Sequence, residues 1–245
     1  MPRFKYSFII CMLLLLTIYF IQVPFSKSQL NINDPYGSSS GVEAEKILII
    51  LDSSYSMTEK INGERKIDIA RKAINEVLRK LPQNVWVGLR VYGHSSSFFG
   101  INDCKASELK VPIGPNNQYL ISNELLKIKP VGWTPISYSI RQAVEHDFNG
   151  LAGKKRIILV SDGMETCDGS PCDYAVSLVR NKIDLKIDVI GFDLSDYTVI
   201  NQLKCTALAT KGKFYTANTS AELSDSLSKS LSVSKEVEGK ILRKN

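Results

Sequence analysis

The stretch that decides the fold is Lys46–Leu51, which reads KILIIL, and residues 52–57 follow it directly as DSSYSM. A short and nearly continuous apolar run indicates a strand that is buried on both faces, as is typical of a parallel sheet covered by helices. The polar residues from 52 onward then lie on the turn that leaves this strand. Sheets of this kind bind ligands at the carboxyl ends of their strands, so the turn is the first candidate for a functional site.

The rest of the chain alternates between short apolar runs and segments with helical periodicity. The expected strands cover residues 46–51, 85–92, 108–112, 156–160, 187–192 and 213–217, and the expected helices cover residues 64–81, 117–128, 137–148, 172–181, 197–210 and 221–236. This alternation predicts an α/β fold, an open and doubly wound sheet of about six mostly parallel strands with helices on both faces.

Three loops of the predicted sheet carry oxygen-bearing side chains. The motif DSSYS leaves the first strand, GWTP precedes the helix expected from residue 137, and SDG follows the strand that ends at residue 160. If the first and fourth strands are neighbours, these loops rise at the same edge of the sheet. We therefore expect one cavity surrounded by the side chains of Asp52, Ser54, Ser56, Thr134 and Asp162. Hydroxyl, carboxylate and water oxygens suit a small hard cation, Mg²⁺ above all, with Mn²⁺ or Ca²⁺ as alternatives.

In this order, the three motifs resemble the metal-ion-dependent adhesion site of the von Willebrand factor type A (VWA) domain, and the resemblance covers about residues 45 to 231. It implies that the hydroxyls of Ser54 and Ser56 bind the cation directly. Thr134 would join them when a ligand is bound, and Asp52 and Asp162 would act largely through bound water. The hydroxyls leave the divalent charge poorly neutralised, so the open coordination position would attract an Asp or Glu carboxylate from a partner protein.

The same loops contain two aromatic candidates for contact with that partner. Tyr55 points out of the metal loop, and Trp133 precedes Thr134, although a partly buried structural role is the alternative for Trp133. The motifs of several enzyme classes are missing from the expected strand ends: no G-x-G-x-x-G follows the first strand, and no G-x-S-x-G elbow joins an expected strand to a helix. Phosphatases that form an aspartyl phosphate need a second aspartate where this chain has Ser54.

The sequence therefore favours a non-enzymatic, exported, metal-dependent protein-binding module of the adhesion type. Two alternatives remain open. One is a membrane-anchored subunit of an envelope assembly or quality-control complex. The other, less favoured, is a metal-dependent hydrolase.

The N-terminal region predicts export. Arg3 and Lys5 precede an apolar run over residues 8–25, and small residues follow it, as in a secretory signal peptide spanning residues 1–28. An uncleaved membrane anchor formed by residues 8–25 is the alternative. Both place the rest of the chain outside the cytoplasm, as a periplasmic, secreted or membrane-anchored protein. Residues 29–43 indicate a linker, residues 44–236 the domain itself, and residues 237–245 a polar tail.

The charge of the chain does not indicate a nucleic-acid partner. The formal net charge is +6, but residues 1–28 contribute three basic side chains and no acidic one, so the remainder carries only +3. That excess is small and scattered along the chain.

Four cysteines lie outside the apolar N-terminal run: Cys104, Cys167, Cys172 and Cys205. An even number in an oxidising compartment predicts two disulfides. Successive helices on one face of the sheet pack side by side, which favours Cys172–Cys205 and leaves Cys104 with Cys167; a local Cys167–Cys172 bridge is the main alternative. The stretch ETCDGSPC, with the later cysteine at 205, further resembles bacterial exported members of the family.

Overall fold

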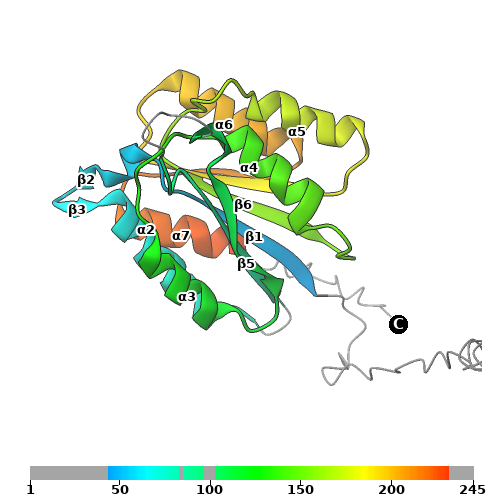
Figure 1. Ribbon diagram of the computed structural model, residues 1–245, viewed down its shortest axis with the longest axis horizontal. Helices are drawn as coiled ribbons and strands as arrows, with labels where there is room; N and C mark the ends of the chain where they lie inside the picture. The colour runs from blue at the N-terminus through cyan, green and yellow to red at the C-terminus, as the bar shows by residue number, and fades with distance from the viewer. Residues whose placement is uncertain (1–43, 83–84, 97–102, 232–245) are drawn as a thin grey trace, which may run out of the picture. The chain divides into compact units, whose positions relative to one another are not determined.

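The computed structural model describes residues 44–82, 85–96 and 103–231 (Figure 1). Six strands form one sheet in the order β5-β4-β1-β6-β7-β8. Their bounds are Glu45–Asp52 for β1, Val85–Tyr92 for β4, Ser107–Gly114 for β5, Lys155–Ser161 for β6, Lys186–Phe192 for β7 and Phe214–Ala217 for β8. All neighbouring strands pair in parallel except β5, which pairs antiparallel with β4 at the edge. The predicted open α/β sheet is confirmed, and β1 and β6 are neighbours as the site hypothesis requires.

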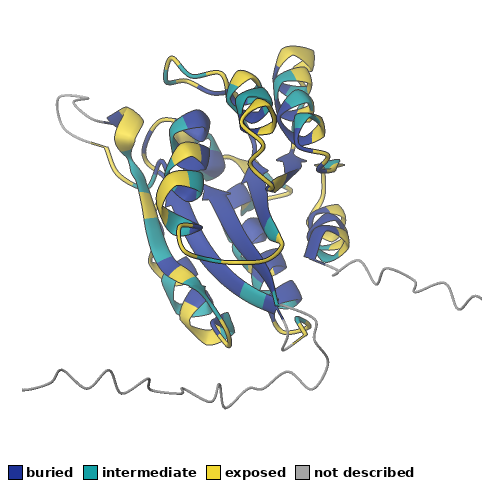
Figure 2. Cartoon of the chain, turned by 90° about the vertical axis from the view of Figure 1, so that its right-hand side faces the viewer, coloured by how far each residue is buried: buried dark blue, intermediate teal, exposed yellow. Residues whose placement is uncertain are grey.

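Helices cover both faces of this sheet (Figure 1). One layer consists of α2 (Lys66–Leu78), α3 (Gln118–Lys127) and α7 (Ser220–Leu231), and the other of α4 (Ile136–Gln142), α5 (Pro171–Arg180) and α6 (Tyr197–Ala209). Because both faces are covered, the central strands have no solvent-facing side, and Figure 2 shows them as a buried layer.

Strand β1 shows why its sequence is a continuous apolar run. Successive side chains of a strand point to opposite faces, so Ile47, Ile49 and Leu51 pack with the first helical layer. Leu48 and Ile50 pack with the second layer. A polar residue at any of these positions would be buried without a partner. The first polar side chain after the apolar run therefore comes at the end of the strand.

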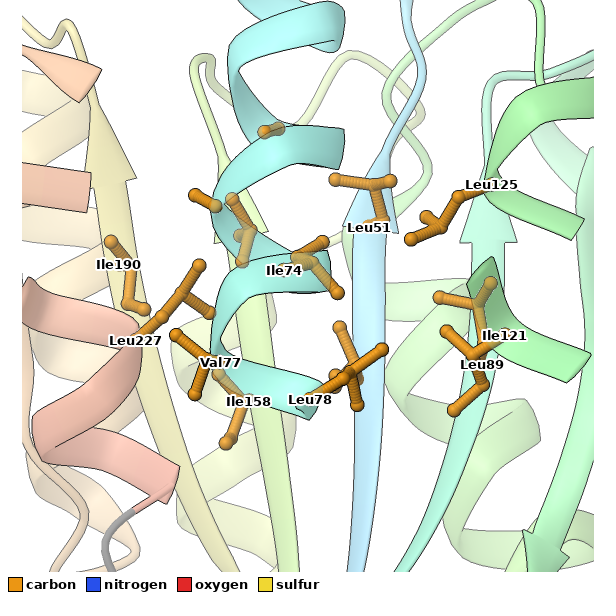
Figure 3. Close-up of a cluster of buried hydrophobic side chains, with 14 of the residues drawn as sticks. Leu51, Ile74, Val77, Leu78, Leu89, Ile121, Leu125, Ile158, Ile190 and Leu227 are labelled. Atoms are coloured by element: carbon orange, nitrogen blue, oxygen red, sulfur yellow. The ribbon is translucent and has the colours of Figure 1, made fainter. Parts of the chain in front are cut away.

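Helix α2 contributes a large part of the first core. Ile74, Val77 and Leu78 of this helix pack over Leu51 of β1 and Ile158 of β6 (Figure 3). Full burial of such a side chain stabilises the fold by about 1.5–3 kcal/mol. This packing fixes α2 against the carboxyl half of β1, which matters for the site because the first residue of α2 reaches it.

The helix expected over residues 64–81 begins later than predicted. Glu64–Arg65 forms β3, which pairs with β2 (Lys60–Ile61) in a two-stranded hairpin. Asn62 and Gly63 have φ values of 51° and 87°. Tight two-residue hairpin turns need positive φ at both central positions, and Asn-Gly supplies it at least cost. The Asn-Gly pair was the missed signal.

The helix expected over residues 137–148 is also different in detail. It starts as α4 and continues as a π-helical turn over Ala143–Asp147. This wider turn ends at Phe148, which is buried in the second core. The other expected helices and strands, the edge strand β5 included, agree with the structure to within two residues at each described end.

Two disulfides are present, and their pairing is the one that helix packing favoured. Cys172 at the start of α5 is bonded to Cys205 in α6, with 5.3 Å between the Cα atoms. Cys104 is bonded to Cys167, with 5.4 Å between the Cα atoms. The local Cys167–Cys172 alternative is therefore wrong.

Some predicted segments lie outside the described residues. These are the signal peptide or anchor (residues 1–28), the linker (residues 29–43), the end of the last expected helix and the C-terminal tail. Within the described part of the chain, every helix is too short or too polar to cross a bilayer.

Candidate metal centre

Asp52 ends β1 and is completely buried between the two neighbouring strands. Its Oδ1 accepts a hydrogen bond from the backbone N–H of Ser54 at 2.8 Å. Its Oδ2 accepts from the hydroxyl of Tyr92 on β4 at 2.8 Å and from that of Ser161 on β6 at 2.7 Å. Burial raises the pKa of Asp52 in spite of these donors. The carboxyl group is therefore held rigidly by neutral donors, and among the described residues its hydrogen-bond partners bring no positive charge.

The two serines of the DSSYS motif form a chain of oxygen atoms that leads away from Asp52. Ser54 Oγ lies 3.0 Å from Ser56 Oγ, and Ser56 Oγ donates to Asp162 Oδ1 at 2.7 Å. The loop turns through a short 3₁₀ helix at this point, and its fully buried Met57 anchors it to the core. Three oxygen-bearing side chains from two different loops thus form a continuous hydrogen-bonded row.

Thr134 reaches the same place from the loop that precedes α4. Ser54 and Gly132 form an isolated parallel bridge, and the N–H of Tyr55 donates to Gly132 O at 3.0 Å. A Cβ atom at Gly132 would lie 2.5 Å from a backbone carbonyl oxygen, so only glycine permits this close approach. Ser54, Ser56 and Thr134 line one pocket of about 340 Å³. Asp52 and Asp162 adjoin this pocket through their hydrogen bonds with Ser54 and Ser56 but do not line it, so three of the five predicted side chains surround the cavity.

Lys66, the first residue of α2, is a member of the site that the sequence analysis missed. Its ammonium group is buried and lies 3.2 Å from Asp162 Oδ2. It also lies 2.7 Å from Glu59 Oε2 and 3.1 Å from Asp193 Oδ2. Burial lowers the pKa of Lys66, but these three carboxylates outweigh burial and hold the pKa above its usual value. One ammonium group is thus shared by three carboxylates.

Asp162 is the carboxylate whose protonation is most affected by this arrangement. Burial, together with the negative charge of Asp52, raises the pKa of Asp162 to about 7, although Ser56 and Lys66 act in the opposite direction. A carboxylate with such a pKa binds a proton when no cation neutralises it. The site therefore has an excess of negative charge that Lys66 does not balance.

Two further residues support Thr134 and were also missed. The N–H of Thr134 donates to Thr166 Oγ1 at 2.8 Å, and the N–H of Thr166 donates back to Thr134 O at 3.2 Å. Glu165 is buried, and its Oε2 accepts from the N–H of Ser137 in α4 at 2.7 Å. The sequence offered no spacing signal for these contacts, because they join segments 28 and 32 residues apart.

The donor set fits a hard divalent cation. The structure offers neutral hydroxyls beside two carboxylates with raised pKa values, and such oxygens suit Mg²⁺, Mn²⁺ or Ca²⁺ better than softer metals. Nowhere in the described residues do three or more His, Cys, Asp or Glu side chains gather in a way that could hold a metal. A metal at this edge of the sheet would depend on serine and threonine hydroxyls.

Apolar side chains surround the pocket at the surface. Tyr55 is 71% exposed and Trp133 is 52% exposed, so the structure places both predicted contact residues on the surface. Val131 lines the same pocket, and Met164, in the loop after β6, is exposed as well. Aromatic residues are enriched at protein–protein interfaces relative to the rest of the surface.

The fold and the site define a class: an open, doubly wound α/β domain with an oxygen-lined site at the carboxyl ends of β1 and β6. Residues 47–165 match the family model of the von Willebrand factor type A domain. The uncharacterized protein YwmD of Bacillus subtilis is 33% identical over 184 residues, which cover 72% of this chain and 80% of YwmD. The chain belongs to the von Willebrand factor type A domain family.

Solved structures show the same fold at lower identity. BatB from Bacteroides thetaiotaomicron is 18% identical, with a TM-score of 0.58, and the match covers 76% of this chain and 98% of that one. Proximal thread matrix protein 1 from the mussel byssus, solved with zinc in its MIDAS motif, is 16% identical with a TM-score of 0.58. That match covers 77% of this chain and 46% of the mussel protein.

Proposed function

We propose that this protein is an exported binding module that captures a carboxylate of a partner protein through a divalent cation. The observation that carries the proposal is the row of oxygen atoms from Ser54 through Ser56 to Asp162, beside the pocket that Thr134 lines. The row offers a divalent cation two neutral hydroxyl oxygens beside one carboxylate. The two disulfides support export, because such bonds persist in oxidising compartments. The signal peptide or anchor of residues 1–28 would bring the domain there.

Each residue has a distinct part in this proposal. Ser54 and Ser56 would supply hydroxyl oxygens to the cation, Mg²⁺ in the first place, and Thr134 would complete the set when a partner is bound. Asp52 and Asp162 would act through bound water, since their oxygens already accept hydrogen bonds from the protein. When bound, the cation supplies a Lewis-acidic position for an anionic oxygen.

The rim residues Tyr55 and Trp133 would contact the apolar neighbours of the partner's carboxylate. Proteins with VWA domains are generally adhesion modules, which agrees with a non-enzymatic role for this chain. The pilus adhesin SpaC from Lactobacillus rhamnosus GG shares the fold, with a TM-score of 0.63.

The test is a titration of the purified protein with Mn²⁺, followed by acetate as the simplest carboxylate. Acetate should bind only to the Mn²⁺-loaded protein and should remove metal-bound water, which water-proton relaxation measures.

Thr134→Ala should weaken acetate binding and leave the fold intact, because the change removes a hydroxyl and little core volume. Asp52→Ala should abolish cation uptake. Thr216→Ala, at an exposed position of β8, is the matched control. Equal acetate binding in excess chelator would sink the proposal.

A further inference from the structure

The loop between β6 and α5 hydrogen-bonds to both backbone groups of Thr134, its N–H and its C=O. Thr166 Oγ1 accepts from the N–H of Thr134, and Thr134 O accepts from the N–H of Thr166. These two bonds fix the backbone of Thr134 on both sides. The side chain of Thr134 is therefore placed by the same loop that begins with Asp162, another of the five proposed cation-site residues.

A second contact fixes the start of α4. The N-cap residue of this helix is Pro135, which makes no side-chain capping bond. Glu165, from another loop, caps the helix instead: its Oε2 accepts from the N–H of Ser137. Its Oε1 accepts from the N–H of Cys167 at 3.0 Å. A carboxylate at a helix N-terminus stabilises it by satisfying an N–H that lacks a partner within the helix and by interacting with the helix dipole.

The Cys104–Cys167 disulfide closes this arrangement from the other side. Cys104 belongs to a short segment whose Ala106 O accepts from the N–H of Gly93 at 2.9 Å. Gly93 O in turn accepts from the N–H of Gly132 at 2.8 Å. The disulfide therefore joins two segments that both support the Thr134 loop, one through Gly93 and the other through Thr166.

We propose that residues 165–167 are a positioning segment for Thr134, and that the Cys104–Cys167 disulfide keeps this segment in register with the cation site. The inference rests on the proposed function, because it assigns a purpose to the placement of Thr134. Apparent affinity falls in proportion to the fraction of molecules whose site is correctly formed. Loss of the disulfide should therefore weaken the binding of cation and acetate together.

The two disulfides of the chain provide a matched comparison. Cys104→Ser/Cys167→Ser and Cys172→Ser/Cys205→Ser each remove one disulfide, and the second pair joins α5 to α6 and includes no residue of the 165–167 segment. In the full-length protein, under conditions where both variants are folded, the first should bind acetate to the Mn²⁺ form about fivefold or more weakly. The second should stay within about twofold of the wild type. Equal affinities in the two variants would overturn the proposal, because a purely structural disulfide changes stability and not the affinity of the folded molecules.

A pair of single substitutions tests the hydrogen bonds directly. Thr166→Val removes the acceptor for Thr134 N–H and keeps the shape of the side chain, whereas Thr166→Ser keeps the hydroxyl. The valine variant should lose acetate affinity and the serine variant should recover most of it. If both bind as tightly as the wild type, the positioning segment is wrong.

Hydrogen exchange separates this proposal from the proposed function. The amide protons of Thr134 and Ser137 should exchange slowly in the wild type and faster in Cys104→Ser/Cys167→Ser, with or without a cation. A wild type that binds no Mn²⁺ but shows this difference would refute the metal-dependent function and leave the positioning segment standing. A wild type that binds Mn²⁺ and shows no exchange difference would do the reverse.

Discussion

Two clusters of buried charge lie toward opposite ends of the central strands. In the one that we call balanced, every carboxylate contacts a cationic side chain. In the other, which we call unbalanced, the carboxylate of Asp52 has only neutral hydrogen-bond donors among the described residues. Near the start of β6, Arg156 Nη2 lies 2.8 Å from Glu45 Oε1, and Arg156 Nη1 lies 3.2 Å from Asp188 Oδ2. Asp188 also accepts from the hydroxyl of Ser230 and the N–H of Lys213, each at 2.8 Å. Two carboxylates share a guanidinium group with several donors, and every charge in this cluster has a near partner.

At the carboxyl ends of β1 and β6 the balance is different. Within the part of the chain that the structure describes, Asp52 has neutral hydrogen-bond donors but no ion pair, and Asp162 shares Lys66 with two other carboxylates. The pKa of Asp162 rises to about 7 as a result of burial and of Asp52. The comparison teaches that buried charge by itself does not mark a site; a buried carboxylate that the protein leaves without a cationic partner does.

The largest expected effect belongs to the balanced cluster. Arg156→Met leaves Glu45 and Asp188 buried without their guanidinium partner and should lower the free energy of unfolding by about 3–5 kcal/mol. Urea unfolding measures this loss. The stabilisation of the variant by Mg²⁺ should equal that of the wild type, because the site lies at the other end of the strands. Arg180→Met at the exposed end of α5 serves as the control. A loss below about 1 kcal/mol would contradict the view of this cluster as a tightly coupled ion pair.

The unbalanced cluster should respond to an added cation. Mg²⁺ at a hundred times its dissociation constant should raise the free energy of unfolding of the wild type by about 2.7 kcal/mol. Asp162→Asn should lose most of this increment, since a carboxylate of the site is gone, whereas Asp184→Asn, exposed in the turn before β7, should keep it. Urea unfolding with Mg²⁺ and with chelator gives both values. An undiminished increment in Asp162→Asn would mean that the cation binds elsewhere.

The same pair of proteins should differ in pH dependence when no cation is present. Asp162 has a pKa of about 7 in the folded protein against an ordinary value of 3.8, so the folded state holds a proton that the unfolded chain has lost. The free energy of unfolding therefore falls as pH rises from about 4 to about 7. Between pH 5 and pH 8 in chelator, the wild type should lose about 2.5 kcal/mol more than Asp162→Asn.

Comparison with Asp162→Asn isolates this residue from other groups that titrate in the same range, such as His94, whose pKa burial lowers. Saturating Mg²⁺ should remove the difference in slope, because it binds the ionised carboxylate. Parallel pH profiles in chelator would show that Asp162 is balanced after all.

The fold was largely predictable because its signals are local. The run over residues 46–51 has no polar break, and only a strand covered on both faces can bury it. The hairpin at Asn62 and Gly63 was not predicted, because helical periodicity from residue 64 outweighed a two-residue turn signal. Periodicity shows which face of a helix is buried, but the first residue of the helix depends on the segment before it.

The site was predictable in part, for a different physical reason. Asp52, Thr134 and Asp162 each stand at the end of a strand or the start of a helix, so the topology alone brings them together. Lys66 and Thr166 depend on the angle at which α2 and the β6–α5 loop approach that edge. Lys66 and Asp162 are 96 residues apart, and no spacing rule connects them.

The smallest expected effect concerns Asp193, an exposed carboxylate that shares Lys66. Its side chain is 42% exposed, and its Oδ2 lies 3.1 Å from the ammonium group. Its φ of 55° is in the left-handed region, which asparagine tolerates, so Asp193→Asn leaves the backbone undisturbed. The substitution releases Lys66 to neutralise Asp162 more fully and removes a negative charge near the site, and both changes disfavour a cation.

Because exposed ion pairs contribute about 1 kcal/mol or less, Mn²⁺ affinity should fall less than about fivefold. Mn²⁺ titrations at low and high NaCl check the reason as well as the size, since salt screens exposed charges and should shrink the difference from the wild type. A loss as large as that of Asp162→Asn, unchanged in high salt, would place Asp193 among the cation's own ligands and not at its periphery.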